Sequence, residues 1–589
     1  VSKRRARAHN NKIDLRSKGV RYMKLTGSQI LIECLVEQGV DTVFGYPGGS
    51  VLNIYDELYK NSDRIHHILT AHEQGASHAA DGYARASGKV GVCIATSGPG
   101  ATNLVTGIAT AYLDSVPVVF ITGNVNVNLI GKDSFQEADI AGITTPITKH
   151  NFIVKDVKDL AEILREAFEI ARTGRPGPVL VDIPKNVTAE TAEYTPETID
   201  TRKKETPVSA EAEADIETLA NMIRSSSKVF LLCGGGALLS GASEEIHRLA
   251  ELIKAPVGCT LMGAGAFPAT HPNFTGMIGM HGTRATNVAV SESELFIALG
   301  SRFNDRVTGD VNKFCKSAKI VQIDIDAAEI NKNVRTAHHI LGDVKSVLKR
   351  LLQRLESAPI ETSEREEWLK TIQALKMPVR AQKLEGFTPK AIISHVQQHL
   401  PQDALIVTDV GQHQMWAARY YNYELPGTFI TSGGFGTMGY GAGASMGAAV
   451  ARPDRKVVLI TGDGCFRMNS NELATMQHYG IPVVILVMNN GVLGMVRQWQ
   501  TVFYGKRYSQ TNLDRGPDFS KLADAYGLKG YTVCSLEQFD EAFAKSIDSG
   551  EAVVIDCRIG CDETIAPMVA PGKPITEFVL HEHESPEQK

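Results

Sequence analysis

The clearest pattern in the chain spans residues 456–490, which read KVVLITGDGCFRMNSNELATMQHYGIPVVILVMNN. Two apolar runs, 456–461 and 482–488, flank a segment with helical spacing, which predicts a strand, a helix and a second, parallel strand. Asp463 and Asn490 directly follow the two strands, so both side chains should lie at the carboxyl edge of the sheet, where α/β proteins bind ligands. A carboxylate and an amide oxygen beside glycines suit a hard divalent cation shared with a diphosphate. We therefore predict a metal and diphosphate site at this edge.

The same alternation of apolar strands and helices runs along the chain in three blocks. Strands that are apolar throughout and separated by helices indicate parallel sheets covered on both faces. We predict an α/β fold with three doubly wound parallel-sheet domains. The predicted organisation is a basic leader at 1–22, a first domain at 23–185, a linker at 186–215, a central domain at 216–350, a second linker at 351–385, a third domain at 386–560 and a tail at 561–589.

The composition narrows the class of protein. The chain has 589 residues, of which 43% are apolar and 22% charged, and this usage excludes a disordered, fibrous or coiled-coil protein. The net charge of −5 argues against a nucleic-acid-binding protein, because such proteins usually carry an excess of basic residues. The nine cysteines show no zinc-site spacing, which favours reduced thiols in a cytosol. Apolar runs are far shorter than the ~18 residues of a membrane span. We expect a soluble, cytoplasmic protein with no nucleic-acid or membrane partner.

The first 22 residues differ from the rest, because they carry eight Lys or Arg against one acid, Asp14. One interpretation is an Arg-rich transit peptide that directs the chain to an organelle. The other is that Val1 is a misassigned start and that Met23 opens the protein. The second is favoured, because the segment lacks the serine-rich amphipathic character of a transit sequence.

Three motifs together resemble the signature of thiamine-diphosphate-dependent enzymes: AHEQG at 71–75, SGPGATN at 97–103, and Gly-Asp-Gly at 462–464 followed by Asn-Asn at 489–490. The resemblance implies that Mg²⁺ is bound by the side chains of Asp463 and Asn490 and by the backbone of Val492. It also implies that Glu73 is the carboxylate that activates the aminopyrimidine of the cofactor. In that family the glutamate and the metal site belong to different subunits, which implies a homodimer or a larger assembly.

Further positions match the thiamine-binding segments of this family. One segment follows the predicted strand at 404–408, and a later loop carries Met438, whose counterpart wedges the cofactor into its bent form. The resemblance implies that the first domain binds the pyrimidine ring and the third the diphosphate. The remaining implied thiamine contacts are Pro99, Asn103, Val410, Gly411, Gln412, His413, Gly436, Gly462, Gly464, Leu493, Gly494 and Met495.

The central block suits an extended dinucleotide. It has glycines after a predicted strand, an arginine that can face a phosphate and acids at the end of a later strand, although it lacks a true GxGxxG motif. Segments such as GSRFNDRVTG at 300–309 resemble the FAD-containing, biosynthetic acetohydroxyacid synthases, and the resemblance extends over nearly the whole chain. The implied FAD contacts, whose role is structural, are Arg175, Gly234, Gly235, Thr260, Leu261, Met262, His281, Gly282, Thr283, Gly300, Arg302, Asp305, Arg306, Asp324, Ile325, Asp343 and Val344.

That resemblance implies the activity. The implied reaction decarboxylates pyruvate on thiamine diphosphate and joins the hydroxyethyl group to a second pyruvate or to 2-ketobutyrate, the first common step of branched-chain amino acid biosynthesis. Gln136, Lys185 and Trp499 match the substrate channel of the family and, with Glu73 and Met438, are the implied catalytic residues. A broad indole can favour a larger 2-ketoacid. A small regulatory subunit is an implied partner.

Two alternatives remain open at this point. A pyruvate-oxidase-like enzyme would use the same two cofactors with FAD as electron acceptor, although the Trp499 segment argues against it. A non-catalytic protein could have kept the fold, but it would be expected to lose Glu73 or Asp463, and both are present. Asn124 and Asn126 depart from the more usual Gln and Pro of the family, which affects the expected pocket shape more than the reaction class.

Overall fold

The computed structural model describes residues 23–201, 207–376 and 386–580. The predicted basic leader therefore lies outside the described residues. The chain separates into two compact units, which are described one at a time. The first contains the described residues up to Ser77, with 90–112 and 117–201; the second contains 78–89, 113–116 and the described residues from 207 onward.

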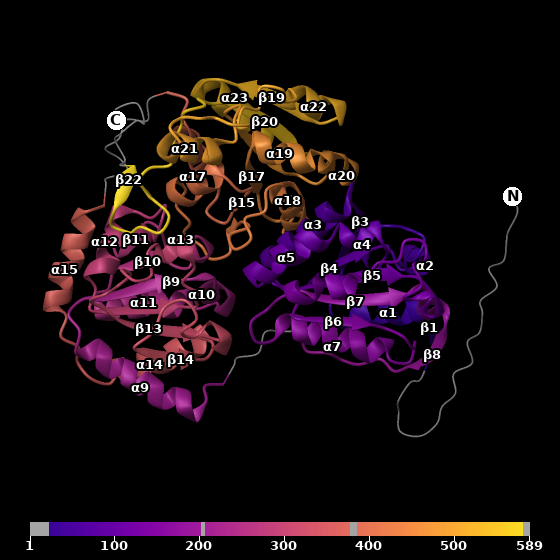
Figure 1. Ribbon diagram of the computed structural model, residues 1–589, viewed down its shortest axis with the longest axis horizontal. Coiled ribbons are helices and arrows are strands. Elements are labelled where there is room, and N and C mark those ends of the chain that lie inside the picture. The colour runs from indigo at the N-terminus through magenta and orange to yellow at the C-terminus, as the bar shows by residue number, and fades with distance from the viewer. Residues whose placement is uncertain (1–22, 202–206, 377–385, 581–589) are drawn as a thin grey trace, which may run out of the picture. The chain divides into compact units, whose positions relative to one another are not determined.

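The first unit contains a parallel six-stranded sheet (Figure 1). Its order is β3-β2-β4-β5-β7-β6. Apolar side chains of the strands pack against α1 (Gly27–Glu37), α2 (Leu52–Lys60) and α7 (Leu160–Arg172) in one core. The strands are β2 (Thr42–Tyr46), β3 (His66–Leu69), β4 (Gly91–Ala95), β5 (Val118–Asn124), β6 (His150–Ile153) and β7 (Val179–Pro184).

The second unit contains two more parallel six-stranded sheets. The central sheet has the order β11-β10-β9-β12-β13-β14, which is 3-2-1-4-5-6 in chain order, the arrangement of dinucleotide-binding folds. Its strands are β9 (Val229–Cys233), β10 (Val257–Cys259), β11 (Phe274–Met277), β12 (Leu295–Leu299), β13 (Lys319–Asp324) and β14 (His338–Leu341).

Both faces of the central sheet are covered (Figure 1). Alternate residues of β9 enter different cores, because successive side chains of a strand point to opposite faces. Val229 and Leu231 join the core with α9 (Ala210–Arg224), α11 (Ser243–Ile253) and α14 (Val344–Glu356). Phe230 and Leu232 join the core with α12 (Arg284–Glu292) and α15 (Ser363–Ala374). The predicted doubly wound arrangement is confirmed here.

The third sheet has the order β16-β15-β17-β18-β20-β19. In chain order this is 2-1-3-4-6-5, the same as the first sheet. In both sheets the order reverses between the first and third strands, so the crevice at their carboxyl ends is the expected place for a ligand. The strands are β15 (Leu405–Thr408), β16 (Phe429–Ile430), β17 (Val457–Gly462), β18 (Val484–Asn489), β19 (Lys529–Val533) and β20 (Val553–Arg558).

Parts of both predicted linkers form regular structure. In the first, α8 (Lys185–Ala189) leads to β8 (Thr191–Tyr194), which pairs antiparallel with β1 (Met23–Thr26) because Ala192 and Tyr194 alternate into the core. In the second, helix α15 forms because Trp368 and Ile372, four residues apart, pack on the central sheet. The predicted tail is also structured up to residue 580, where β21 (Met568–Val569) pairs with β22 (Phe578–Leu580).

Across residues 23–201, 207–376 and 386–580, no helix is both long enough and apolar enough to cross a bilayer.

Candidate functional site

The predicted metal ligands lie at neighbouring strand ends of the third sheet. Gly462 of β17 is in register with Met488 of β18, so Asp463 and Asn490 follow adjacent strands. Asp463 opens α19 (Asp463–Asn469) and is buried, and burial raises its pKa to about 6. The side chain of Asn490 accepts a hydrogen bond from the backbone N–H of Val492 at 3.2 Å. A buried carboxylate beside an amide oxygen fits a divalent cation, whose charge would favour the ionised carboxylate.

The turn after β15 lies against both of these strand ends. The imidazole of His413 fills the space beside Gly462, where an added Cβ would lie 2.8 Å from Nδ1. Gln412 accepts a hydrogen bond from the amide of Asn490 at 3.2 Å and donates one to Gln498 at 2.9 Å. An added Cβ on Gly494 would lie 2.0 Å from Gln412 Oε1, so a larger residue there would displace the Gln412 side chain. The structure thus brings together the three loops that follow β15, β17 and β18.

His413 is buried and starts α17 (Gln412–Tyr420) together with Gln412. Burial lowers the pKa of its imidazole to about 3, so the ring is neutral at physiological pH. Within the described ranges, its Nε2 atom has no hydrogen-bond partner. An unsatisfied buried nitrogen beside the carboxyl ends of β15 and β17 fits a polar group of a bound cofactor.

Met438, the predicted apolar support of the thiamine ring, lies beside the loop that follows β17. It belongs to the loop at 431–439, between β16 and α18 (Tyr440–Ala451). Its methyl carbon lies 3.8 Å from the Cβ position of Gly464, and Leu493 Cδ2 lies 2.8 Å from the same position. Gly436 in this loop has a φ of +74°, and its Cβ position lies 3.8 Å from Val410. The apolar and glycine positions predicted for the thiamine site therefore meet at one place.

In the first unit, Glu73, Pro99 and Asn103 lie together. Glu73 begins α3 (Glu73–Ser87) just after β3, is buried, and accepts a hydrogen bond from the Asn103 amide at 3.0 Å. Pro99 opens α4 (Pro99–Thr102), whose Gly100 has a Cβ position only 3.1 Å from Glu73 Oε1. The hydrogen bond from Asn103 orients the carboxylate.

The remaining predicted residues of the first unit are more dispersed. The backbone of Gln136 packs beside Gly98, whose Cβ position lies 2.8 Å from the Gln136 carbonyl oxygen. Lys185 is exposed at the start of α8, just beyond the carboxyl end of β7. Arg175 precedes β7 and so lies toward the amino edge of this sheet, away from Glu73 and Lys185.

The glycine-rich turns of the central sheet meet at its switch point. An added Cβ on Gly234, after β9, would lie 2.1 Å from the carbonyl oxygen of Gly300, after β12. Gly300 itself has a φ of +60°, which favours glycine. An added Cβ on Gly235 would lie 3.3 Å from Met262 Cβ. These two glycine turns, which have no side chains, lie at the switch point of a sheet with the strand order 3-2-1-4-5-6. They leave room for a dinucleotide to approach the backbone closely.

His281 is a second orphaned histidine, in the central block. Burial lowers the pKa of its ring to about 3, and within residues 207–376 and 386–580 its Nδ1 atom has no hydrogen-bond partner. Thr260, after β10, donates its backbone N–H to Cys233 at 2.9 Å, which holds Leu261 and Met262 beside the turn after β9. These features fit the predicted flavin contacts.

Several predicted flavin residues also have local structural roles. Thr283 accepts from the N–H of Thr286 at the start of α12, and Asp343 accepts from that of Ser346 at the start of α14. Asp324, at the end of β13, accepts a hydrogen bond from the N–H of Asp326 at 3.0 Å. Asp305 and Arg306 form an exposed ion pair at 2.9 Å. Helix capping alone accounts for Thr283 and Asp343, because these residue types favour the N-cap.

Trp499 lies on α21 (Gly494–Phe503) between aromatic and basic neighbours. Its ring meets Phe503 edge-on at 5.7 Å, and the Arg306 guanidinium lies over it at 5.9 Å. Its buried indole Nε1 has no hydrogen-bond partner in the part of the chain that the structure describes. Trp499, a predicted substrate-channel residue, thus makes a cation–π contact with Arg306, a predicted flavin residue.

Sequence reasoning missed a buried charged cluster in the second unit. Arg85 pairs with Asp81 at 2.7 Å and with Asp114 at 2.9 Å. The spacing of Asp81 and Arg85 on one helix face was a usable signal for the first pair. Nothing in the local sequence pointed to Asp114 as the second partner.

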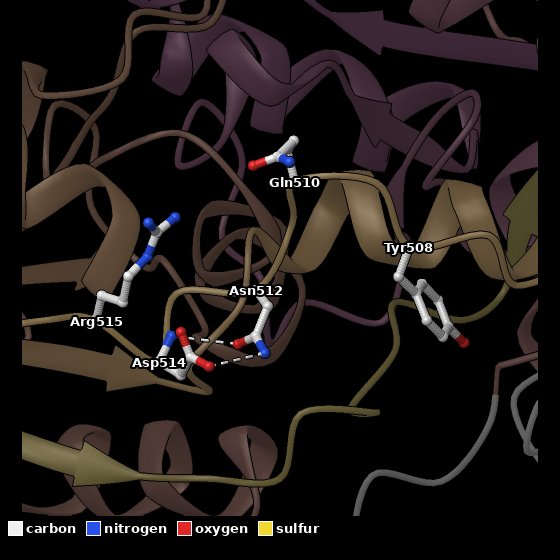
Figure 2. A pocket seen from close by; sticks show the side chains of 5 residues that line it. All are labelled: Tyr508, Gln510, Asn512, Asp514 and Arg515. Atoms are coloured by element: carbon white, nitrogen blue, oxygen red, sulfur yellow. Dashed lines mark hydrogen bonds between the residues drawn. The ribbon is translucent and has the colours of Figure 1, made fainter.

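A surface pocket of about 590 Å³ lies beside the loop that carries Asn490 and Val492, since Asn512 forms an isolated β-bridge with Val492. Figure 2 shows Asn512 and Asp514 hydrogen-bonded to each other, with Arg515 alongside. The lining residues are Tyr508, Gln510, Asn512, Asp514 and Arg515. None of them is a predicted site residue.

Three family models match the chain. They are the thiamine pyrophosphate enzyme N-terminal TPP binding domain at residues 25–143, the central domain at 216–351, and the C-terminal TPP binding domain at 409–557. These matches fall on the three parallel sheets.

Curated relatives match over nearly their full length. A probable acetolactate synthase large subunit of Methanocaldococcus jannaschii is 48% identical over 574 residues, covering 94% of this chain and 95% of the relative. The acetolactate synthase large subunit of Corynebacterium glutamicum is 47% identical, covering 93% and 89%. That of Cyanidium caldarium is 46% identical, covering 93% and 95%.

Proposed function

Because the chain belongs to the acetolactate synthase large-subunit family of thiamine pyrophosphate enzymes, we propose that it forms 2-acetohydroxy acids from 2-ketoacids. Two pyruvate molecules and one proton give 2-acetolactate and CO₂. Replacing the second pyruvate by 2-ketobutyrate gives 2-aceto-2-hydroxybutyrate. The proposed place of the reaction is the first common step of branched-chain amino acid biosynthesis.

The observation that carries this proposal is the gathering of Asp463, Asn490, His413 and Met438 at one edge of the third sheet. Thiamine diphosphate, when bound, supplies the electron sink that makes decarboxylation of a 2-ketoacid possible. We assign Asp463, Asn490 and the backbone of Val492 to Mg²⁺, which would hold the diphosphate. His413 and Gln412 would bind the cofactor beside them, and Met438 would support its ring.

Glu73 is assigned to hold and move a proton at N1′ of the aminopyrimidine. Its support is the arrangement within the first unit, where Asn103 orients the carboxylate and Gly100 leaves room beside it. A carboxylate must be held in a suitable orientation to exchange a proton with a ring nitrogen.

We assign FAD to the central sheet in a structural role. The support is the strand order, the contact of Gly234 with Gly300, and the unpartnered Nδ1 of buried His281. Arg302 and Asp324 would contact the nucleotide. The role is taken as structural because the proposed condensation has no net oxidation or reduction.

Gln136, Lys185 and Trp499 are assigned to the second substrate. The exposed Lys185 ammonium can attract a ketoacid carboxylate, and the Trp499 indole offers an apolar wall to its alkyl group. The same proposal includes a homodimer or larger assembly, a small regulatory subunit and a cytoplasmic location. The two relatives from Methanocaldococcus jannaschii and Corynebacterium glutamicum are named large subunits, which supports a small subunit as partner.

A product assay with mixed ketoacids tests the proposal. Purified protein is supplied with Mg²⁺ and thiamine diphosphate, with and without FAD, and given pyruvate and 2-ketobutyrate under anaerobic conditions. We expect both acetohydroxy acids and a flavin that stays oxidised. Bleaching of the flavin with formation of acetate would instead support the oxidase alternative, and the absence of any acetohydroxy acid would contradict the proposal.

A further inference from the structure

The loop at 431–439 carries Met438, and the turn within it, at 434–436, is exposed. Gly434, Phe435 and Gly436 are exposed, and Phe435 keeps 48% of its surface accessible. Three of the four residues at 433–436 are glycines, which have the largest backbone freedom to lose on ordering. Hydrogen bonds to the backbone therefore contribute to where this turn, and Met438 after it, is placed.

Asp114 supplies two of those hydrogen bonds. Its buried carboxylate accepts from the backbone N–H of Gly433 at 3.1 Å and from that of Gly434 at 2.6 Å, one on each oxygen. An added Cβ on Gly434 would lie 2.7 Å from Asp114 Oδ1 and 2.8 Å from the carbonyl oxygen of Leu113. Glycine at 434 thus permits a close, two-point contact between an ionised side chain and the loop.

Arg85 connects this contact to both flanks of the loop. Its guanidinium pairs with Asp114 at 2.9 Å and with Asp81 at 2.7 Å, and donates to the carbonyl of Thr431 at 3.1 Å. The hydroxyl of Tyr440, just after the loop, donates to Asp81 at 2.6 Å. We call these four side chains, Arg85, Asp81, Asp114 and Tyr440, the Arg85 cluster.

The hydrogen bonds of the Arg85 cluster hold the loop at 431–439 in place. Asp81 and Asp114 have no exposed side-chain surface and Arg85 only 13%, so each charge depends on the partners just named. A shift of the loop would leave a buried carboxylate or guanidinium without them, which proteins avoid because unpaired buried charges are costly. The buried charges therefore restrict the loop to one position.

We propose that Asp114 and Arg85 are positioning residues, which hold the loop at 431–439 so that Met438 supports bound thiamine diphosphate. Both act through the backbone of Thr431, Gly433 and Gly434. This inference rests on the proposed function, because it requires thiamine diphosphate at the third sheet.

The test compares Asp114→Asn with a matched control, Glu37→Gln. Glu37 is also a buried carboxylate that pairs with an arginine, Arg165, and accepts hydrogen bonds from a tyrosine hydroxyl and a backbone N–H, but it lies in the first unit far along the chain from the loop. The measurements are the Kd of thiamine diphosphate with Mg²⁺, the near-UV circular dichroism of the bound cofactor, kcat, the KM for pyruvate and the melting temperature.

We expect both variants to lower the melting temperature. Only Asp114→Asn should raise the Kd of thiamine diphosphate about tenfold, alter the dichroism of the bound cofactor and lower kcat at saturating cofactor, with the KM for pyruvate within twofold of wild type. A Kd and a spectrum that stay within twofold of wild type in Asp114→Asn would overturn the proposal, because the cluster would then be only structural.

Gly434→Ala is the second variant, for the case in which Asp114→Asn does not fold. The residue is exposed, so the change leaves the buried charges intact, but its Cβ would push the loop away from Asp114. It should reproduce the loss of cofactor affinity, and normal affinity would overturn the proposal. A wild type that neither binds thiamine diphosphate nor forms acetolactate would instead refute the proposed function, before any variant is compared.

Discussion

Asp182, in strand β7 of the first unit, provides a stability prediction that does not involve the third sheet. Its carboxyl group is buried and accepts hydrogen bonds from Thr122 at 2.7 Å and from the amide of Asn124 at 2.5 Å, both on the neighbouring strand β5. Burial raises its pKa from 3.8 to about 7, because the hydrogen bonds offset only part of the desolvation of the charged form. We predict that Asp182→Asn removes a pH dependence of stability.

The raised pKa of Asp182 determines whether the free energy of unfolding rises or falls with pH. Below about pH 4 the group is protonated in both the folded and the unfolded chain, and its contribution is fully present. Between pH 4 and 7 the unfolded chain releases the proton while the folded chain keeps it, so the free energy of unfolding falls as the pH rises. The difference of about three pKa units corresponds to roughly 4 kcal/mol in total, of which about 2.5 kcal/mol falls between pH 5 and pH 8.

Hydrogen exchange of the backbone amides of β5 and β7 is the suitable assay. All three tryptophans, at 368, 416 and 499, lie outside the first unit, so their fluorescence would not report on it. After correction for intrinsic exchange, the opening free energy in the wild type should fall between pH 5 and pH 8 by about 2.5 kcal/mol more than in Asp182→Asn.

Asp56→Asn is the control for this comparison, since Asp56 is an exposed carboxylate of the same unit that pairs with Lys60. It should follow the wild-type pH profile. Parallel profiles for the wild type and Asp182→Asn would refute the reasoning, because Asp182 would then titrate in the folded chain as it does in the unfolded chain.

Three further substitutions test the site and its surroundings. Glu73→Gln should keep Mg²⁺ and cofactor binding but slow hydrogen–deuterium exchange at the thiazolium C2 at least about a hundredfold; near-normal exchange would contradict the assigned role. Trp499→Leu should lower the preference for 2-ketobutyrate over pyruvate about tenfold in a competition assay, and an unchanged product ratio would count against the assignment. His78→Phe should stabilise the chain by ~1–3 kcal/mol, because both ring nitrogens of this buried histidine lack hydrogen-bond partners among the described residues, while its ring packs edge-on against Tyr440. A lower urea midpoint than wild type would show that the histidine nitrogens have a partner after all.

Local patterns in the sequence predicted much of the site. An apolar run that ends in polar residues beside a glycine places those polar residues at a strand end, and Asp463 and Asn490 lie there. The position of Glu73 at a helix start was predicted in the same way. Short strands were not recognised, since β16 has two residues and β10 three, too few for a detectable period. Helix α15 was missed because its few apolar residues, Trp368 and Ile372 among them, lie in a strongly charged stretch.

The sequence by itself determined the class of fold, the three blocks and the residues that carry the cofactor motifs, because each of these depends on patterns within a few tens of residues. Only the tertiary structure decided the strand orders and the partners of buried polar groups. The contact between Asp114 and Gly434 joins residues 320 positions apart, and that between Arg85 and Thr431 joins residues 346 apart. Such pairs arise because a buried charge must find a partner wherever the packed chain supplies one, and no local pattern records which segment that will be.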